Sequence, residues 1–177
     1  VVFAPSVAEM YPAGLDGAIT LDPGPLGAVL EGAERPTHFR GVLTVVAKLF
    51  GLVRPNVAVF GEKDYQQLAL IRLMSRELRL GVEVVGCPTV REASGLAMSS
   101  RNQYLSDSER ERAAAISAAL RSGADAGAGG ADAVLTAAAK ILADAGIDPD
   151  YLVLTSPDLG PVQPTGEARL LIAARVG

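Results

Sequence analysis

Cysteine and histidine are almost absent from this chain of 177 residues, which contains one of each, Cys87 and His38. A single cysteine cannot form a disulfide within the chain, and such scarcity is typical of a reducing compartment. A zinc site needs several cysteine or histidine ligands. The sequence therefore excludes an internal disulfide and a cysteine-based metal site, and it favours a cytoplasmic protein.

An excess of basic residues is also lacking. The chain has 16 Lys and Arg against 20 Asp and Glu, a formal charge of −4 and a pI near 5.0. This balance argues against a general nucleic-acid binder, which usually carries a basic surface. Hydrophobic residues make up 49% and charged residues 20%, as in soluble globular proteins with one domain or two small ones.

Long hydrophobic runs are missing as well. A bilayer-spanning helix needs about 18 or more apolar residues, and the longest run, residues 42–53, is interrupted by Thr44, Lys48 and Gly51. The start of the chain has no basic segment of the kind that opens a signal peptide. We therefore expect no membrane association.

The two ends of the chain suggest a piece of a longer protein. The chain begins without methionine at an apolar stretch, VVF, that resembles the end of a buried strand. Domains rarely begin inside a strand, so we expect a preceding segment. Residues 170–176 are also strand-like, with little after them.

Residues 1–88 show an alternation of helices and strands. Strands are predicted at residues 57–60 and 82–86, and helices at residues 37–53 and 64–79, where apolar residues recur at helical spacing. Such alternation predicts an α/β fold with a parallel sheet. Before residue 37 we expect a helix capped by Ser6, a strand at 18–21, a helix at 26–30 and a loop at 31–36.

Residues 89–177 are predicted to form a small α+β domain. Residues 89–105 are polar and rich in turns, and Ser106 with Glu109 forms a capping box that opens a helix to about residue 122. A second helix spans residues 131–145, and strands follow at 151–155 and 168–176. The Ala- and Gly-rich residues 123–130 fit a flexible loop or a frayed helix end equally well.

The segment GEKDYQQ, residues 61–67, is the most informative stretch. It joins a predicted strand to a predicted helix, and parallel α/β sheets bind nucleotides outside the carboxyl ends of their strands. Gly61 permits close approach of the backbone to a ligand, the helix directs its free N–H groups there, and Lys63 adds a positive charge. These features fit a phosphate site, although for an isolated turn of this kind a solvated loop lysine is the simpler explanation.

A second polar turn, residues 98–102 (MSSRN), strengthens the phosphate hypothesis. Ser99, Ser100 and Arg101 offer two hydroxyls and a guanidinium, which bind phosphates by charge-assisted hydrogen bonds. Gly95 could serve as a hinge that lets this turn close on a nucleotide. A plain interdomain turn is the alternative.

Four other polar residues leave alternatives open. Gln66 and Gln67 cannot face the same way on a helix, so at most one binds a ligand. Asp64 either caps the following helix or assists Mg²⁺ and phosphate. His38 is a helix cap or an acid–base group, and Cys87 is interpreted as a structural thiol.

Together these segments resemble the pantothenate synthetase (pantoate–β-alanine ligase) family. The resemblance covers essentially the whole chain. It is carried by four segments: RPTHF at residues 35–39, FGEKDYQQ at 60–67, PTVRE at 88–92 and GLAMSSRN at 95–102. Tyr11-Pro12 and Leu170-Leu171 also match.

The resemblance implies a Rossmann-like nucleotidyltransferase domain followed by a smaller C-terminal domain, in a cytoplasmic homodimer. It implies an enzyme that uses ATP and Mg²⁺ to convert pantoate into an acyl adenylate, which β-alanine then attacks to give pantothenate and AMP. The implied ATP-binding residues are Gly61, Glu62, Lys63, Asp64, Val90, Met98, Ser99, Ser100 and Arg101. Lys63, Ser99, Ser100 and Arg101 would also be catalytic, and Gln67 would bind pantoate.

The chain departs from the family pattern in one respect. Nothing in it matches the family's N-terminal signature with two histidines, and His38 does not replace that signature. We therefore expect the chain to lack about the first third of the enzyme and to be inactive by itself. The alternatives are a non-catalytic nucleotide-binding or dimerisation fragment, and another adenylyltransferase of the same superfamily.

Overall fold

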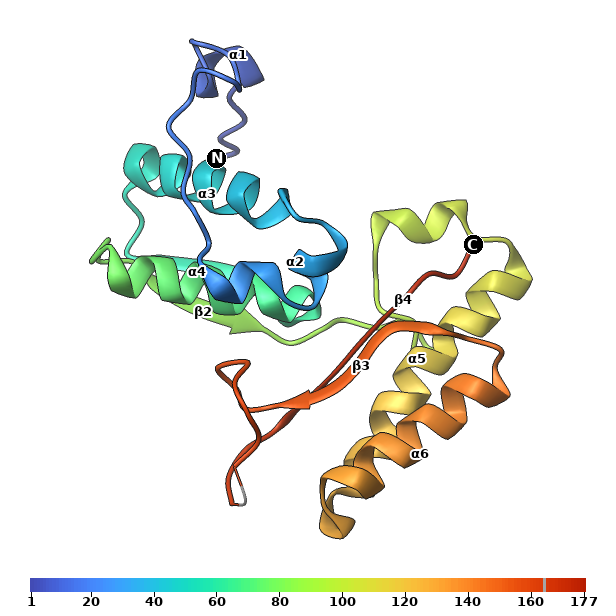
Figure 1. Cartoon of the computed structure of the whole chain (residues 1–177). Helices are drawn as coiled ribbons and strands as arrows, with labels where there is room; N and C mark the ends of the chain where they lie inside the picture. Colours follow the sequence, from blue (N-terminus) through green and yellow to red (C-terminus); the bar gives the residue numbers. More distant parts are fainter. Residues whose placement is uncertain (164) are drawn as a thin grey trace. The chain divides into compact units, whose positions relative to one another are not determined.

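The computed structural model describes residues 1–163 and 165–177 (Figure 1). The chain divides into two compact units, Val1–Cys87 and Pro88–Gly177. The first unit contains a parallel pair of strands with helices, and the second contains helices and an antiparallel pair. The predicted α/β class is therefore confirmed, with a parallel sheet followed by a small α+β unit.

The first unit begins with short helices, continues with a 16-residue helix and ends with a β–α–β arrangement. Its elements are α1 (Val7–Met10), η1 (Pro25–Ala28), α2 (Glu31–Glu34), α3 (His38–Val53), β1 (Val57–Gly61), η2 (Glu62–Asp64), α4 (Tyr65–Glu77) and β2 (Glu83–Cys87). The parallel register runs from Val57 opposite Glu83 to Gly61 opposite Cys87. Both strands therefore end at the same edge, where parallel sheets place their ligands.

The core of the first unit lies on one face of this sheet. Phe39, Leu43 and Phe50 of α3 pack with Leu70 and Ile71 of α4. Alternate strand residues join this core, and the rings of Phe50 and Phe60 meet edge to face with their centroids 6.3 Å apart. The intervening strand residues point to the other face, where Val57, Val59 and Val85 are exposed. This alternation follows from the two-residue period of a strand.

The second unit packs two long helices against a hairpin of strands. Its elements are η3 (Ser100–Tyr104), α5 (Asp107–Asp125), η4 (Gly127–Gly129), α6 (Ala131–Asp144), β3 (Pro149–Thr155) and β4 (Arg169–Ala174). Figure 1 shows α5 and α6 lying side by side. Ala119, Ala138 and Leu142 form the centre of their contact, and Leu152 and Leu170 of the strands pack onto it. The small alanines let the helices approach closely.

The capping box predicted at the start of α5 is confirmed. The Ser106 side chain accepts from the backbone N–H of Glu109, and the Glu109 carboxylate accepts from the backbone N–H of Ser106. Hydrogen bonds from the Ser106 side chain and backbone lower the pKa of Glu109. Because a lowered carboxyl pKa stabilises the fold only while the group is ionised, this contribution is lost as the pH falls through that pKa. Ser6 and Glu9 form the same motif at α1.

Four local predictions differ from the structure. Neither residues 1–3 nor residues 18–21 form a strand, because no strand among the described residues lies beside either segment. The N–H of Leu21 instead donates to Thr44 Oγ1 at 3.0 Å. The helix predicted at residues 26–30 is a 3-10 turn ending at Ala28. The loop predicted at 31–36 contains the one-turn helix α2.

The segment at residues 123–130 continues α5 to Asp125 and then forms η4, so the flexible-loop interpretation is wrong. Packing explains the glycine inside this helix. A Cβ at Gly123 would lie 2.5 Å from Leu170 Cδ2 and 3.2 Å from the Val134 carbonyl oxygen. Gly123 therefore allows α5 to approach β4 and α6 closely, and it does not mark a break.

Candidate functional site

The segment at residues 61–67 forms a strand, a 3-10 turn and a helix start at the carboxyl edge of the parallel sheet. Gly61 closes β1, η2 follows, and α4 begins at Tyr65. Cys87 is paired with Gly61 and ends β2 at the same edge. The predicted strand–turn–helix arrangement is therefore confirmed.

Gly61 leaves open space above the backbone at the end of β1. Its backbone is extended, with φ −68° and ψ 138°, a conformation that any residue adopts. A Cβ placed on it would meet nothing within 4 Å. The folded chain therefore does not itself require glycine here, and the missing side chain leaves room for a ligand at the sheet edge.

Lys63 and Asp64 form an exposed ion pair on this turn. Lys63 Nζ lies 3.1 Å from Asp64 Oδ1, and the side chains are 44% and 63% exposed. Asp64 occupies the N-cap position of α4, but its side chain accepts no capping hydrogen bond. The capping alternative for Asp64 is therefore wrong. Both charges are accessible, and an exposed pair of this kind is weak enough for a polyanion to replace.

Glu62 points differently from its two neighbours. The residue is half-buried, and a Cβ at Gly86 in β2 would lie 3.0 Å from both Glu62 Oε1 and Arg72 Nη2. The carboxylate therefore lies over β2 beside a guanidinium. The backbone of Glu62 therefore lies at the sheet edge with the other candidate residues, whereas its side chain is directed toward β2.

The two glutamines that open α4 have different surroundings. Gln66 is buried; its Oε1 accepts from the N–H of Glu31 at 3.1 Å, and its Nε2 donates to the carbonyls of Leu26 and Val29, both at 2.8 Å. Gln66 thus fastens η1 and α2 to α4. Gln67 is half-buried and makes no side-chain hydrogen bond to any residue that the structure describes. Gln67 is the glutamine available to a ligand.

The second group of candidate residues lies on a small hairpin in the other unit. Arg91 and Ala97 form an antiparallel bridge, and the N–H of Met98 donates to the carbonyl of Val90 at 2.9 Å. Val90 and Met98 are therefore opposite each other, and both side chains are exposed, at 62% and 60%. Two neighbouring exposed apolar side chains suit the face of a flat ring such as a nucleobase.

The polar turn follows directly after this hairpin. Ser99 is the N-cap of η3, and its Oγ accepts from the N–H of Arg101 at 3.2 Å. Ser100 and Arg101 are exposed. Gly95 has φ +91° at the hairpin turn, and a Cβ there would lie 3.3 Å from Arg121 Nη1 and 3.4 Å from Ser117 Oγ of α5. Gly95 is a packed turn residue, which gives no support to the predicted hinge.

The candidate residues thus fall into two groups, one in each unit. The first group, residues 61–67, lies at the edge of the parallel sheet. The second group, Val90 and residues 98–101, lies on the hairpin and η3. Each group is assembled by its own unit. Their joint use by one ligand belongs to the proposal made below.

The structure contradicts the cap alternative for His38 and the structural role predicted for Cys87. Thr37 is the N-cap of α3, so His38 is not the cap; it is half-buried, and its ring lies 5.0 Å from that of Phe39. Cys87 is an exposed free thiol and not a buried structural one. It is exposed because it occupies the uncovered face of the sheet.

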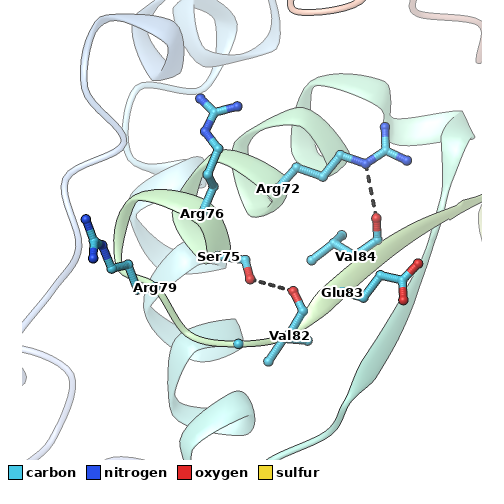
Figure 2. Close-up of a pocket in the computed structure, with 8 residues that line it drawn as sticks. Arg72, Ser75, Arg76, Arg79, Val82, Glu83 and Val84 are labelled. Carbon is cyan, nitrogen blue, oxygen red and sulfur yellow. Dashed lines mark hydrogen bonds between the residues drawn. The ribbon is translucent and has the colours of Figure 1, made fainter.

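An open cavity of about 390 Å³ lies at the opposite end of α4 (Figure 2). Its lining residues are Arg72, Ser75, Arg76, Arg79, Gly81, Val82, Glu83 and Val84. Figure 2 shows the three guanidinium groups pointing in different directions, with the Arg72 Nε donating to the Val84 carbonyl at 3.2 Å. A helix C-terminus carries partial negative charge, which favours cations over bound anions. We therefore interpret these arginines as cations that complement the C-terminal end of α4 and not as ligand-binding residues.

The described residues offer neither a cluster of metal ligands nor a membrane-spanning helix. Within residues 1–163 and 165–177, no cluster of three or more His, Cys, Asp or Glu side chains is arranged to hold a metal ion. No helix in the same residues is both long and apolar enough to cross a membrane.

Comparison with known proteins gives a consistent result. The family model described as pantoate-beta-alanine ligase matches residues 1–177. A pantothenate synthetase of Nocardia farcinica is 59% identical over 177 residues, which cover 99% of this chain and 55% of that protein. The chain thus spans about half the length of the curated relatives that it matches.

Two solved structures are also similar to the chain. The pantothenate synthetase of Thermus thermophilus is 47% identical with a TM-score of 0.91, over 98% of this chain and 64% of that one. A pantoate-beta-alanine ligase of Francisella tularensis, described as complexed with beta-gamma ATP and beta-alanine, is 29% identical with a TM-score of 0.67, over 96% of this chain and 61% of that one.

Proposed function

Because the chain belongs to the pantoate–β-alanine ligase family, we propose that it forms the ATP-binding part of an AMP-forming ligase that makes pantothenate. In the first step the pantoate carboxylate attacks the α-phosphorus of ATP, releasing pyrophosphate and forming pantoyl adenylate. In the second, the β-alanine amine attacks the acyl carbon and AMP leaves. The observation that carries this proposal is the family match over the entire chain, in which the two long motifs form the exposed turns described above.

Residues 61–64 would bind the phosphates of ATP at the edge of the parallel sheet. Lys63 would exchange its contact with Asp64 for a phosphate oxygen, placing fixed positive charge where negative charge develops. Gly61 would leave room for the nucleotide, since no protein atom fills the space above it. Glu62 and Asp64 would contact the nucleotide from the same turn.

Residues on the hairpin and η3 would bind the remainder of ATP. Val90 and Met98 would contact the adenine ring through their exposed side chains. The hydroxyls of Ser99 and Ser100 and the guanidinium of Arg101 would hold the triphosphate by charge-assisted hydrogen bonds. With Lys63, these three residues would stabilise the transition state of adenylation.

Gln67 would bind pantoate from the first turn of α4. Its amide offers both a donor and an acceptor, which suits a hydroxy acid. Gln66 has its amide occupied by three backbone groups. The pantoate contact is therefore assigned to Gln67 alone.

Three further properties belong to the same proposal. Mg²⁺ would arrive as part of the ATP complex, bound mainly by phosphate oxygens and water, as this ion prefers. The protein would be a cytoplasmic homodimer. The small-molecule partners would be pantoate and β-alanine. All three properties follow from the family resemblance.

The reaction is tested by separating its two steps. The intact protein, incubated with pantoate, ATP and Mg²⁺, is expected to release pyrophosphate without β-alanine and to release AMP and pantothenate once β-alanine is added. Pyrophosphate release with another carboxylic acid in place of pantoate would favour a different adenylyltransferase. ATP binding without any pyrophosphate release would favour a non-catalytic nucleotide-binding protein.

Cys87 provides a direct test of where ATP binds. It is the only cysteine of this 177-residue chain, it is exposed, and it lies beside Gly61 at the end of the neighbouring strand. We expect ATP at ten times its Kd to slow alkylation of Cys87 by iodoacetamide about tenfold, because about a tenth of the protein then remains free. Protection should disappear in Lys63→Ala at the same ATP concentration. An unchanged alkylation rate with ATP bound, shown by calorimetry, would contradict the placement at this sheet edge.

A further inference from the structure

A half-buried polar cluster in the second unit connects the hairpin, η3 and α5. It consists of Glu92 from the hairpin, Asn102 from η3 and Arg110 from α5. Arg110 Nη1 donates to both carboxylate oxygens of Glu92, at 2.8 and 3.0 Å. Arg110 Nη2 donates to the carbonyl of Asn102 at 3.0 Å. One guanidinium therefore joins two segments that are separate in the sequence.

Asn102 closes the turn that carries the phosphate-binding candidates. Its Nδ2 donates to the Ala97 carbonyl at 3.0 Å and to Glu92 Oε1 at 3.3 Å. Its backbone N–H donates to the Ser99 carbonyl at 3.1 Å. Residues 97 and 102 flank the turn of residues 98–101 on either side. The Asn102 amide thus fastens the two ends of this turn together.

The arrangement holds Asn102 from two directions. Glu92 accepts from its side chain and Arg110 donates to its backbone, while the ion pair between Glu92 and Arg110 fixes these two groups relative to each other. The two charged side chains remain 37% and 33% exposed, so solvent screens the ion pair and its contribution to stability is modest. The ion pair matters more for geometry than for stability, because it holds Asn102, whose amide joins the two ends of the turn.

We propose that Asn102 is a positioning residue for adenylation, held by Glu92 and Arg110, and that it fixes residues 98–101 in the conformation that binds the triphosphate. This inference rests on the proposed function and adds residues that do not themselves touch ATP. Ser100 and Arg101 are exposed, so packing does not fix their side chains, and the backbone of the turn sets the region that their polar groups can reach. Preorganised donors lose most of their effect when displaced by about 1 Å.

The test compares variants of nearly equal shape in the intact protein. Asn102→Asp keeps the volume but replaces the Nδ2 donor by a second carboxylate oxygen, which would face Glu92 and the Ala97 carbonyl. We expect kcat/KM for ATP in adenylation to fall by about 10- to 100-fold, with the Kd for pantoate unchanged. Glu92→Ala should show the same loss, whereas Glu92→Gln, which keeps an accepting oxygen, should recover most of the activity.

Arg112 supplies the matched control. It lies on α5 two residues from Arg110, is exposed, and is not among the hydrogen-bond or ion-pair partners of Glu92 and Asn102 in the described residues. Arg112→Ala should keep the kinetic constants of the unsubstituted protein. Thermal unfolding and the concentration of active sites are measured for every variant, so that loss of folded protein is separated from loss of rate.

The outcomes distinguish the inference from the function on which it rests. If the unsubstituted protein releases no pyrophosphate with ATP and pantoate, both fail. If it is active and Asn102→Asp has the same kcat and the same KM for ATP, the positioning role is wrong while the function stands. The positioning role is also wrong if the lost activity equals the lost folded fraction, because each folded molecule would then work normally.

Discussion

Replacement of Lys63 by alanine is expected to slow formation of pantoyl adenylate by roughly 100-fold, the size of effect seen when one preorganised charge or donor is removed. Lys63 is the only cation among the exposed residues of the turn at 61–64. Its positive charge would face the phosphates as pyrophosphate leaves and negative charge accumulates. The measurement is pyrophosphate release at saturating ATP and pantoate.

Folding should barely change in this variant. Lys63 contributes one exposed ion pair with Asp64, and such pairs are worth about 0–1 kcal/mol. Lys140→Ala is the matched control, because Lys140 forms a similarly exposed pair with Asp144, 2.6 Å apart, in α6. The control should retain full activity. Normal pyrophosphate release by Lys63→Ala would remove Lys63 from the catalytic group.

The neighbouring glutamines are expected to give opposite results when each is replaced by alanine. Gln66→Ala should lower the free energy of unfolding by about 2–3 kcal/mol, because unsatisfied buried polar groups cost about 1–3 kcal/mol. The groups left without their partner are the N–H of Glu31 and the carbonyls of Leu26 and Val29. Gln67→Ala should leave stability within about 0.5 kcal/mol and weaken pantoate binding.

Urea denaturation and calorimetry separate these two effects. Gln67→Ala should bind ATP with its usual affinity while its Kd for pantoate rises, whereas Gln66→Ala should show its main change in the unfolding transition. Each glutamine serves as the control for the other, since the substitution and the helix are the same. Equal loss of ATP and pantoate binding in Gln67→Ala would show a structural role for Gln67 instead.

Local patterns predicted the main elements well because the interactions that form them are local. The capping box at Ser106 and Glu109 joins residues three positions apart, and the helical spacing of apolar residues in α3 and α4 requires no knowledge of their partners. The strand predictions at residues 1–3 and 18–21 are wrong, because a strand forms only beside another strand. Apolar composition alone could not supply that neighbour.

The sequence by itself determined the order of the long helices and the strands from residue 37 onward, the two polar motifs and the family that they indicate. The tertiary structure decided which side chains of those motifs are free. Gln66 and Gln67 are adjacent in sequence, yet only Gln66 meets Glu31 and Leu26, which lie 35 and 40 residues away. Likewise, the contact of Arg110 with Glu92 spans 18 residues and gives Asn102 a role that the motif does not reveal. Such contacts depend on how helices pack, and packing is set by side chains far apart in the chain, so no window of sequence contains it.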